Sequence, residues 1–74
     1  MNESEIERLR DLYHELEQAQ RKLEALLAEK QSQLKTMPRK AEAFQEVELS
    51  VDSLGYAVDD LDSVLGNLEE LIEL

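Results

Sequence analysis

The sequence predicts an all-α fold, an antiparallel two-helix hairpin that dimerises into a four-helix bundle. Apolar residues recur every three or four positions along both halves of the chain, one proline separates the halves, and glycine occurs only twice. Helical side chains return to the same face at that spacing, whereas strand side chains alternate between faces at every residue. The 74 residues are predicted to form a single domain.

The first helix is predicted over about residues 4–35. Asn2 or Ser4 can cap its start by accepting a backbone N–H bond. Its seam, the row expected to face other helices, steps alternately by three and four. Leu12, Ala19 and Leu26 repeat beside the seam at seven-residue spacing and widen it, which suits a bundle. The seam consists of Ile6, Leu9, Tyr13, Leu16, Gln20, Leu23, Leu27, Lys30, Leu34 and Met37.

Two polar residues interrupt this seam. Lys30 is expected near the closed end of the hairpin, where its stem can pack while its ammonium reaches water. Gln20 has two interpretations: it sets the register or the oligomeric state, as buried polar seam residues sometimes do, or it is simply tolerated there.

The second helix is predicted over about residues 39–73, after a turn at about 36–38. Pro38 fits the first turn of a helix, with Thr36 as its cap. Ala57, Val64 and Leu71 flank the seam as in the first helix. Because the seam continues through Gly55, we expect a bend or a close helix crossing there rather than a third helix. One long kinked helix is the alternative to a hairpin. The second seam consists of Phe44, Val47, Val51, Leu54, Val58, Leu61, Leu65, Leu68 and Ile72.

Two apolar faces of this width cannot both be covered within one pair of helices. The flanking rows would stay exposed, and exposed apolar surface of that extent usually marks an interface. We expect a homodimer with twofold symmetry, the commonest assembly of identical chains. A hairpin docked on helices of a different protein would cover the same surface.

The charge is divided unevenly between the two halves. Residues 1–40 hold eight bases and eight acids, whereas residues 41–74 hold ten acids and no base, so the net charge of −10 belongs to the second half. Such a surface excludes nucleic acid and membranes as direct partners and favours a basic protein, including one whose nucleic-acid-binding cleft the acids would fill as a mimic. Solubility is the alternative reason for the charge. The expected acidic partner-binding residues are Glu42, Glu46, Asp52, Asp59, Asp60, Glu70 and Glu73.

Leu49 and Tyr56 lie seven residues apart, opposite the second seam. On a straight helix both would be exposed among the acids and could anchor a partner. A bend at Gly55 could instead turn Tyr56 inward.

The residues that carry catalysis are missing. The chain has no cysteine, one histidine (His14), and no phosphate loop, nucleophile elbow or zinc spacing, so we expect no enzyme activity, no cofactor and no metal site. Asp59, Asp60 and Asp62 lie on a helical seam rather than on the turning loop that calcium needs. No secretory signal or membrane span is recognisable, and a cytoplasmic location is expected.

The second half resembles small acidic coiled-coil proteins of bacterial prophages and other mobile elements. The resemblance runs from Met37-Pro38 through Val58-Asp59-Asp60-Leu61-Asp62-Ser63-Val64-Leu65-Gly66-Asn67-Leu68-Glu69-Glu70-Leu71. Those proteins share a charged first helix, a short turn with proline and a second helix of repeated Asp/Glu-Leu units. The resemblance implies a host-modulating role, such as that of an inhibitor. Length and helix layout also resemble the short hairpin co-chaperones of type III secretion, which implies an assembly adaptor that binds through its apolar seam. A purely structural homodimer is the third possibility.

Overall fold

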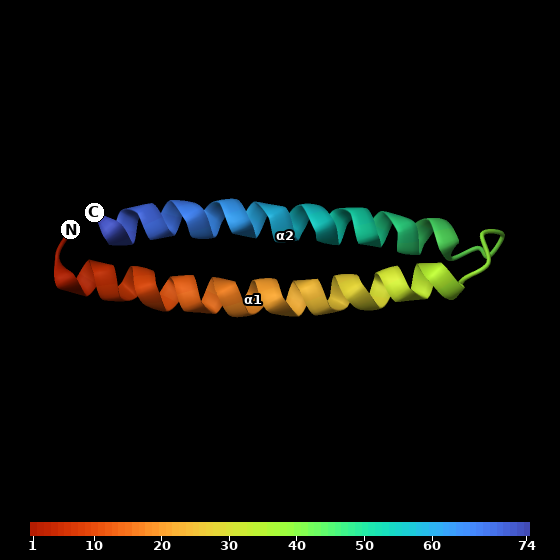
Figure 1. Cartoon of the computed structure of the whole chain (residues 1–74), viewed down its shortest axis with the longest axis horizontal. Coiled ribbons are helices and arrows are strands. Elements are labelled where there is room, and N and C mark those ends of the chain that lie inside the picture. Colours follow the sequence, from red (N-terminus) through yellow and green to blue (C-terminus); the bar gives the residue numbers. More distant parts are fainter.

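Figure 1 shows the computed structural model, which describes all of residues 1–74 as two long helices lying side by side. Helix α1 spans Glu3–Thr36 and helix α2 spans Phe44–Glu73. They run antiparallel, so both chain ends lie at one end of a rod of 57 × 14 × 14 Å. The predicted all-α hairpin is confirmed. Neither helix contains a segment of the length and apolarity needed to cross a bilayer.

The start of α1 is capped as the sequence predicted. The Asn2 side-chain oxygen accepts a bond of 2.9 Å from the backbone N–H of Glu5, and the Asn2 amide donates to the Glu5 carboxylate at 3.5 Å. The first bond satisfies the backbone N–H of Glu5, which has no partner inside the helix, and the second holds the two side chains together. Glu3 and Glu5 also place negative charge at the positive end of the helix dipole.

The connection is longer than the sequence predicted. Helix α2 begins at Phe44 rather than at about residue 39, so the chain reverses over residues 37–43. Two successive turns make the reversal, with bonds of 3.0 Å from the Ala41 N–H to the Pro38 carbonyl and 3.1 Å from the Phe44 N–H to the Ala41 carbonyl.

The predicted caps of α2 were also wrong. Pro38 lies in the connection and not in the first turn of the helix. Thr36 belongs to α1, where its hydroxyl donates to the Gln33 carbonyl at 3.2 Å. Ala43 occupies the cap position of α2 and supplies no side-chain bond. The start of this helix is therefore held by the two turns and by packing.

Helix α2 continues unbroken through Gly55. A methyl group added at Gly55 would meet no atom within 4 Å, and the same is true at Gly66. The expected close helix crossing at Gly55 is therefore wrong. Glycine is not required at either position by the packing of the hairpin.

Gln20 forms side-chain hydrogen bonds to α2 from within the seam. Its side-chain amide donates to the Val58 carbonyl at 3.1 Å and to the Asp62 carboxylate at 2.5 Å, and its side chain is only 8% exposed. Since Gln20 lies opposite the turn between Val58 and Asp62, the seam spacing places Leu16 near Leu65 and Leu23 near Val58. The bonds show that Gln20 pairs across the seam within the hairpin, and its role in setting the register stays a prediction.

The core is thin. Val47 and Leu65 are the only apolar residues that are buried, and no side chain is completely enclosed. The other seam residues of both helices are half-buried. Each side chain touches the opposite helix on one side and remains open on another, as expected for a single layer of two helices.

Two different flanks border the seam. In each helix, one row of residues immediately precedes every second seam residue, as Leu12 precedes Tyr13 and Val64 precedes Leu65. When two helices pack antiparallel, these two rows lie side by side along the same edge of the seam. One side is therefore apolar, and we call it the apolar flank: Leu12, Ala19, Leu26, Ala57, Val64 and Leu71. The opposite side is the polar flank: Arg10, Glu17, Glu24, Gln31, Glu48, Gly55, Asp62 and Glu69. The flanks give the rod two sides of opposite character.

Candidate protein-binding site

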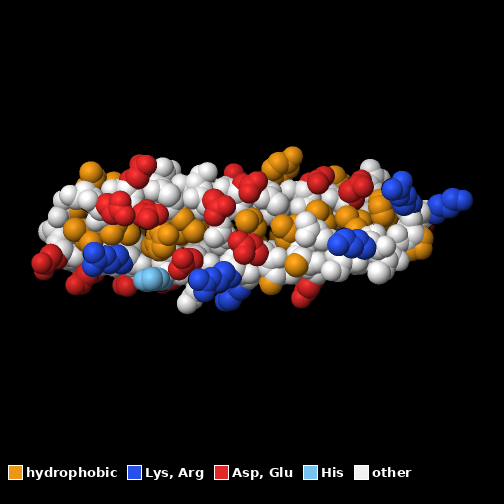
Figure 2. Space-filling view, viewed as in Figure 1, with side chains coloured by type: hydrophobic (Ala, Val, Ile, Leu, Met, Phe, Trp, Pro, Cys, Tyr) orange, Lys and Arg blue, Asp and Glu red, His pale blue; other side chains and the backbone are white.

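The outer surface of α2, turned away from α1, is strongly acidic. Its carboxylates occupy the helical positions farthest from the seam, and each of them is exposed. Figure 2 shows acidic side chains gathered along α2, whereas basic side chains lie along α1 and the connection. We call these acids, together with Glu42 in the connection just before α2, the acidic face: Glu42, Glu46, Asp52, Asp59, Asp60, Glu70 and Glu73.

No base neutralises the acidic face. No lysine or arginine nitrogen lies within 4.0 Å of a carboxylate oxygen, and the one short contact of opposite type joins His14 Nδ1 to Glu17 Oε1 at 3.8 Å within α1. The last turn of α2 contains no basic residue. No ion pair within the hairpin therefore occupies these carboxylates.

Leu49 and Tyr56 lie on the same outer surface. Tyr56 is 70% exposed and Leu49 is 58% exposed, so the alternative in which Tyr56 turns inward is wrong. Asp52, Asp59 and Asp60 are three or four residues from Tyr56, which makes them its neighbours on the helix surface. An apolar anchor thus stands in the middle of the acidic face.

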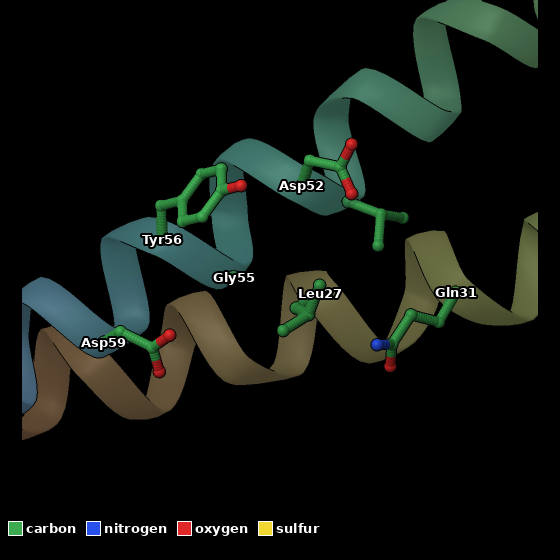
Figure 3. Close-up of a pocket in the computed structure, with 7 residues that line it drawn as sticks. Leu27, Gln31, Asp52, Gly55, Tyr56 and Asp59 are labelled. Carbon is green, nitrogen blue, oxygen red and sulfur yellow. The ribbon is translucent and has the colours of Figure 1, made fainter.

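A shallow groove of about 270 Å³ lies between the helices beside Tyr56. Gly55 opens it, since this polar-flank position carries no side chain. Leu27 and Val51 supply apolar surface, while Gln31, Asp52, Tyr56 and Asp59 supply polar groups. Figure 3 shows Asp52, Tyr56 and Asp59 extending from α2 and Leu27 and Gln31 from α1. The groove therefore combines an apolar lining with two carboxylates.

The remaining acids of α2 point elsewhere. Asp62 faces α1, where it accepts the bond from Gln20, so the Asp59-Asp60-Asp62 cluster does not converge. No three carboxylate or histidine groups are arranged to hold a metal ion.

Partial burial raises the pKa of the Tyr13 phenol, and the carboxylates of Glu69 and Glu17 raise it further.

The structure brings the predicted seam residues together along one line between α1 and α2. They are Leu9, Tyr13, Leu16, Leu23, Leu27, Phe44, Val47, Val51, Leu54, Val58, Leu61, Leu65, Leu68 and Ile72, and all are buried or half-buried. Sequence reasoning missed the groove. Its signal was Gly55 at a position beside the seam, where the other residues of the row in α2 are Glu48, Asp62 and Glu69.

Comparison of the chain with protein-family models, with curated proteins and with solved structures finds no match.

Proposed function

We propose that this hairpin is a non-catalytic interaction module whose acidic face binds a basic segment of another protein. In doing so it blocks a surface that would otherwise bind nucleic-acid phosphates. The observation that supports this proposal most is the groove beside Tyr56, where unpaired carboxylates border apolar surface.

The groove suits a lysine or arginine side chain. The aliphatic stem of such a residue can pack on Leu27 and Val51, because long basic side chains cover apolar surface with their methylene groups. Its charged end then lies between the carboxylates of Asp52 and Asp59. The exposed ring of Tyr56 offers a cation–π contact to the same charge. A protein with several basic side chains at helical spacing would use Leu49 as a further contact.

The proposed binding partner is a protein of the host cell. The second half of the chain resembles small acidic coiled-coil proteins of prophages and mobile elements, as noted above. A host protein that handles DNA or RNA in the cytoplasm would present the required basic surface. Repulsion between the ten acids of residues 41–74 and phosphates or anionic lipids argues against direct binding to either.

Salt dependence of binding to a labelled peptide rich in arginine and leucine tests the proposal. We expect the affinity to fall steeply as salt rises from about 50 mM to about 500 mM, because exposed charges are screened over a shorter distance. Asp52→Asn/Asp59→Asn should weaken binding about tenfold or more at low salt. Glu3→Gln/Glu7→Gln makes the same charge change on α1 and should have a much smaller effect. Equal effects of the two double variants would show that only net charge matters.

The glycines of α2 supply a second matched pair of variants. A methyl group at Gly55 occupies part of the groove, whereas one at Gly66 lies outside it. Gly55→Ala should therefore weaken binding of the peptide, and Gly66→Ala should leave it unchanged. If Gly55→Ala binds normally, the groove does not receive the basic side chain.

The exposed apolar flank favours a second candidate function, that of a chaperone or assembly adaptor. Leu12, Leu26, Val64 and Leu71 are each exposed by more than 40%. An adaptor that held an apolar partner there would bind almost independently of salt. Substitution of Leu26 by Gln would weaken it, and substitution of Asp52 and Asp59 would not.

A further inference from the structure

We propose that a second copy of this chain covers the apolar flank. The two hairpins form a four-helix bundle with their connections at opposite ends, and the twofold axis passes beside Ala19 and Val64. This inference concerns a different surface from the acidic face and does not depend on what the acidic face binds.

The amount of exposed surface supports a partner of this size. The hairpin exposes 5845 Å², whereas a compact monomer of its mass is expected to expose about 4,650 Å². The excess of about 1,200 Å² per chain exceeds the roughly 800 Å² that each partner buries in an interface of standard size. The apolar flank is where this excess is least compatible with water, because it holds four of the exposed large apolar side chains.

The apolar flank fits itself when one copy is reversed. The register seen in the bonds of Gln20 groups its residues into three layers along the rod: Leu12 with Leu71, Ala19 with Val64, and Leu26 with Ala57. A twofold axis at the middle layer brings the bulky pair, Leu12 and Leu71, onto the smaller pair, Leu26 and Ala57, of the second copy. Ala19 then meets Ala19, where small side chains let two α1 helices approach closely. Alternation of large and small residues across facing layers is what close packing requires.

The charges at the edge of the apolar flank are also self-complementary. On α1 they alternate in sign at seven-residue spacing: Arg8, Glu15, Lys22 and Glu29, all exposed. The midpoint of this row falls beside Ala19. Reversal about that point sets Arg8 opposite Glu29 and Glu15 opposite Lys22, so every charge in the row faces the opposite sign. Such a pattern fixes register and orientation between partners.

Helix α2 avoids repulsion in the same arrangement. The corresponding edge of α2 carries Glu46, Ser53, Asp60 and Asn67. The twofold axis beside Val64 sets Asp60 opposite Asn67 of the second copy and leaves Glu46 beyond the apolar layers. Leu49 and Tyr56 lie on the outer edge of the bundle, where they stay exposed. Asp60 thus lies at the rim of the interface, and the rest of each acidic face stays outside it along one edge of the dimer.

Cysteine crosslinking tests the arrangement directly, because the chain contains no cysteine of its own. We expect Ala19→Cys to form a covalent dimer rapidly on oxidation or with a short bifunctional maleimide. Ala25→Cys, an exposed alanine on the outer surface of α1, is the matched control and should react slowly. If Ala19→Cys crosslinks only when mixed with Val64→Cys, the connections lie at the same end and the proposed orientation is wrong. If neither combination exceeds the control, the apolar flank is not the interface.

The mass of the protein in solution tests whether a second copy of the chain covers the apolar flank. Sedimentation equilibrium should give twice the mass of the chain, and Leu26→Gln should raise the dimer dissociation constant about tenfold or more. Leu49→Gln removes a more exposed leucine from the outer surface and should leave the dissociation constant unchanged. A folded monomer at concentrations near 1 mM would overturn the proposal.

Discussion

Replacement of Gln20 by alanine should lower the stability of the hairpin by about 2 kcal/mol. The bond to the Val58 carbonyl contributes about 1 kcal/mol, as neutral hydrogen bonds do. The bond to Asp62 is charge-assisted, but Asp62 is exposed, so we discount it to about 1 kcal/mol. For a domain of this size the total corresponds to a fall in melting temperature of roughly 10 °C.

Thermal and urea unfolding followed by circular dichroism would measure this loss, with protein concentration held constant because dimerisation makes stability concentration-dependent. Gln18→Ala is the matched control: Gln18 is exposed on the same helix, and its loss should change stability by less than about 0.5 kcal/mol. A double-mutant cycle with Asp62→Ala isolates the bond between Gln20 and Asp62. A coupling energy of about 1 kcal/mol is expected.

Gln20→Leu separates the two parts of the argument. Leucine makes no hydrogen bond, but it extends the apolar seam and leaves no buried group without a partner, because Asp62 can turn to water. We expect this variant to be at least as stable as the natural chain. Our account of Gln20 would be refuted if Gln20→Ala were as stable as Gln18→Ala, or if the cycle with Asp62 showed no coupling.

Three further predictions follow from local features of the helices. Asn2→Ala removes the α1 cap and should cost about 1 kcal/mol, with faster hydrogen exchange confined to the first turn. Gly66→Ala should stabilise the chain by about 1 kcal/mol in urea unfolding, because its methyl group meets no other atom. In Tyr56→Phe the one remaining phenol, Tyr13, should ionise in absorbance titrations at a higher pH in the folded chain than in urea. Because folding raises this pKa, the neutral phenol's contribution to stability is present below pH about 10 and is lost as pH rises through the folded-state value.

The regular part of the fold was predictable from sequence because it depends on periodicity. Spacings of three and four identify the buried side of each helix whatever that side packs against, and Pro38 marks the interruption between the helices. The exposure of Leu12 and Leu26 was also expected from the width of the seam, since two helices cannot cover both flanks.

The connection and the groove were not predictable in the same way. The length of the connection depends on the distance between the packed helices, which no local pattern in residues 36–44 expresses. The groove arises because Gly55 lies beside the seam while Leu27 and Val51 lie within it, and this placement needs the register between helices. Gln20 bonds across the seam to a carboxylate 42 residues away. A polar seam residue can bond within the hairpin or between two hairpins. The sequence pattern is the same in both cases, and only the three-dimensional structure shows which bond is made.

The distribution of acids on α2 is unfavourable for folding. Glu69, Glu70 and Glu73 crowd the negative end of the helix dipole, and no basic residue occupies the last turn. Each such placement costs a few tenths of a kcal/mol, and a base at any of these positions would remove it. Solubility requires net charge, but it does not require that the charge be confined to one helix. Nor does it require an exposed tyrosine and leucine among the acids. The proposed function would account for both features, because the acids would attract a basic partner and Leu49 and Tyr56 would contact it.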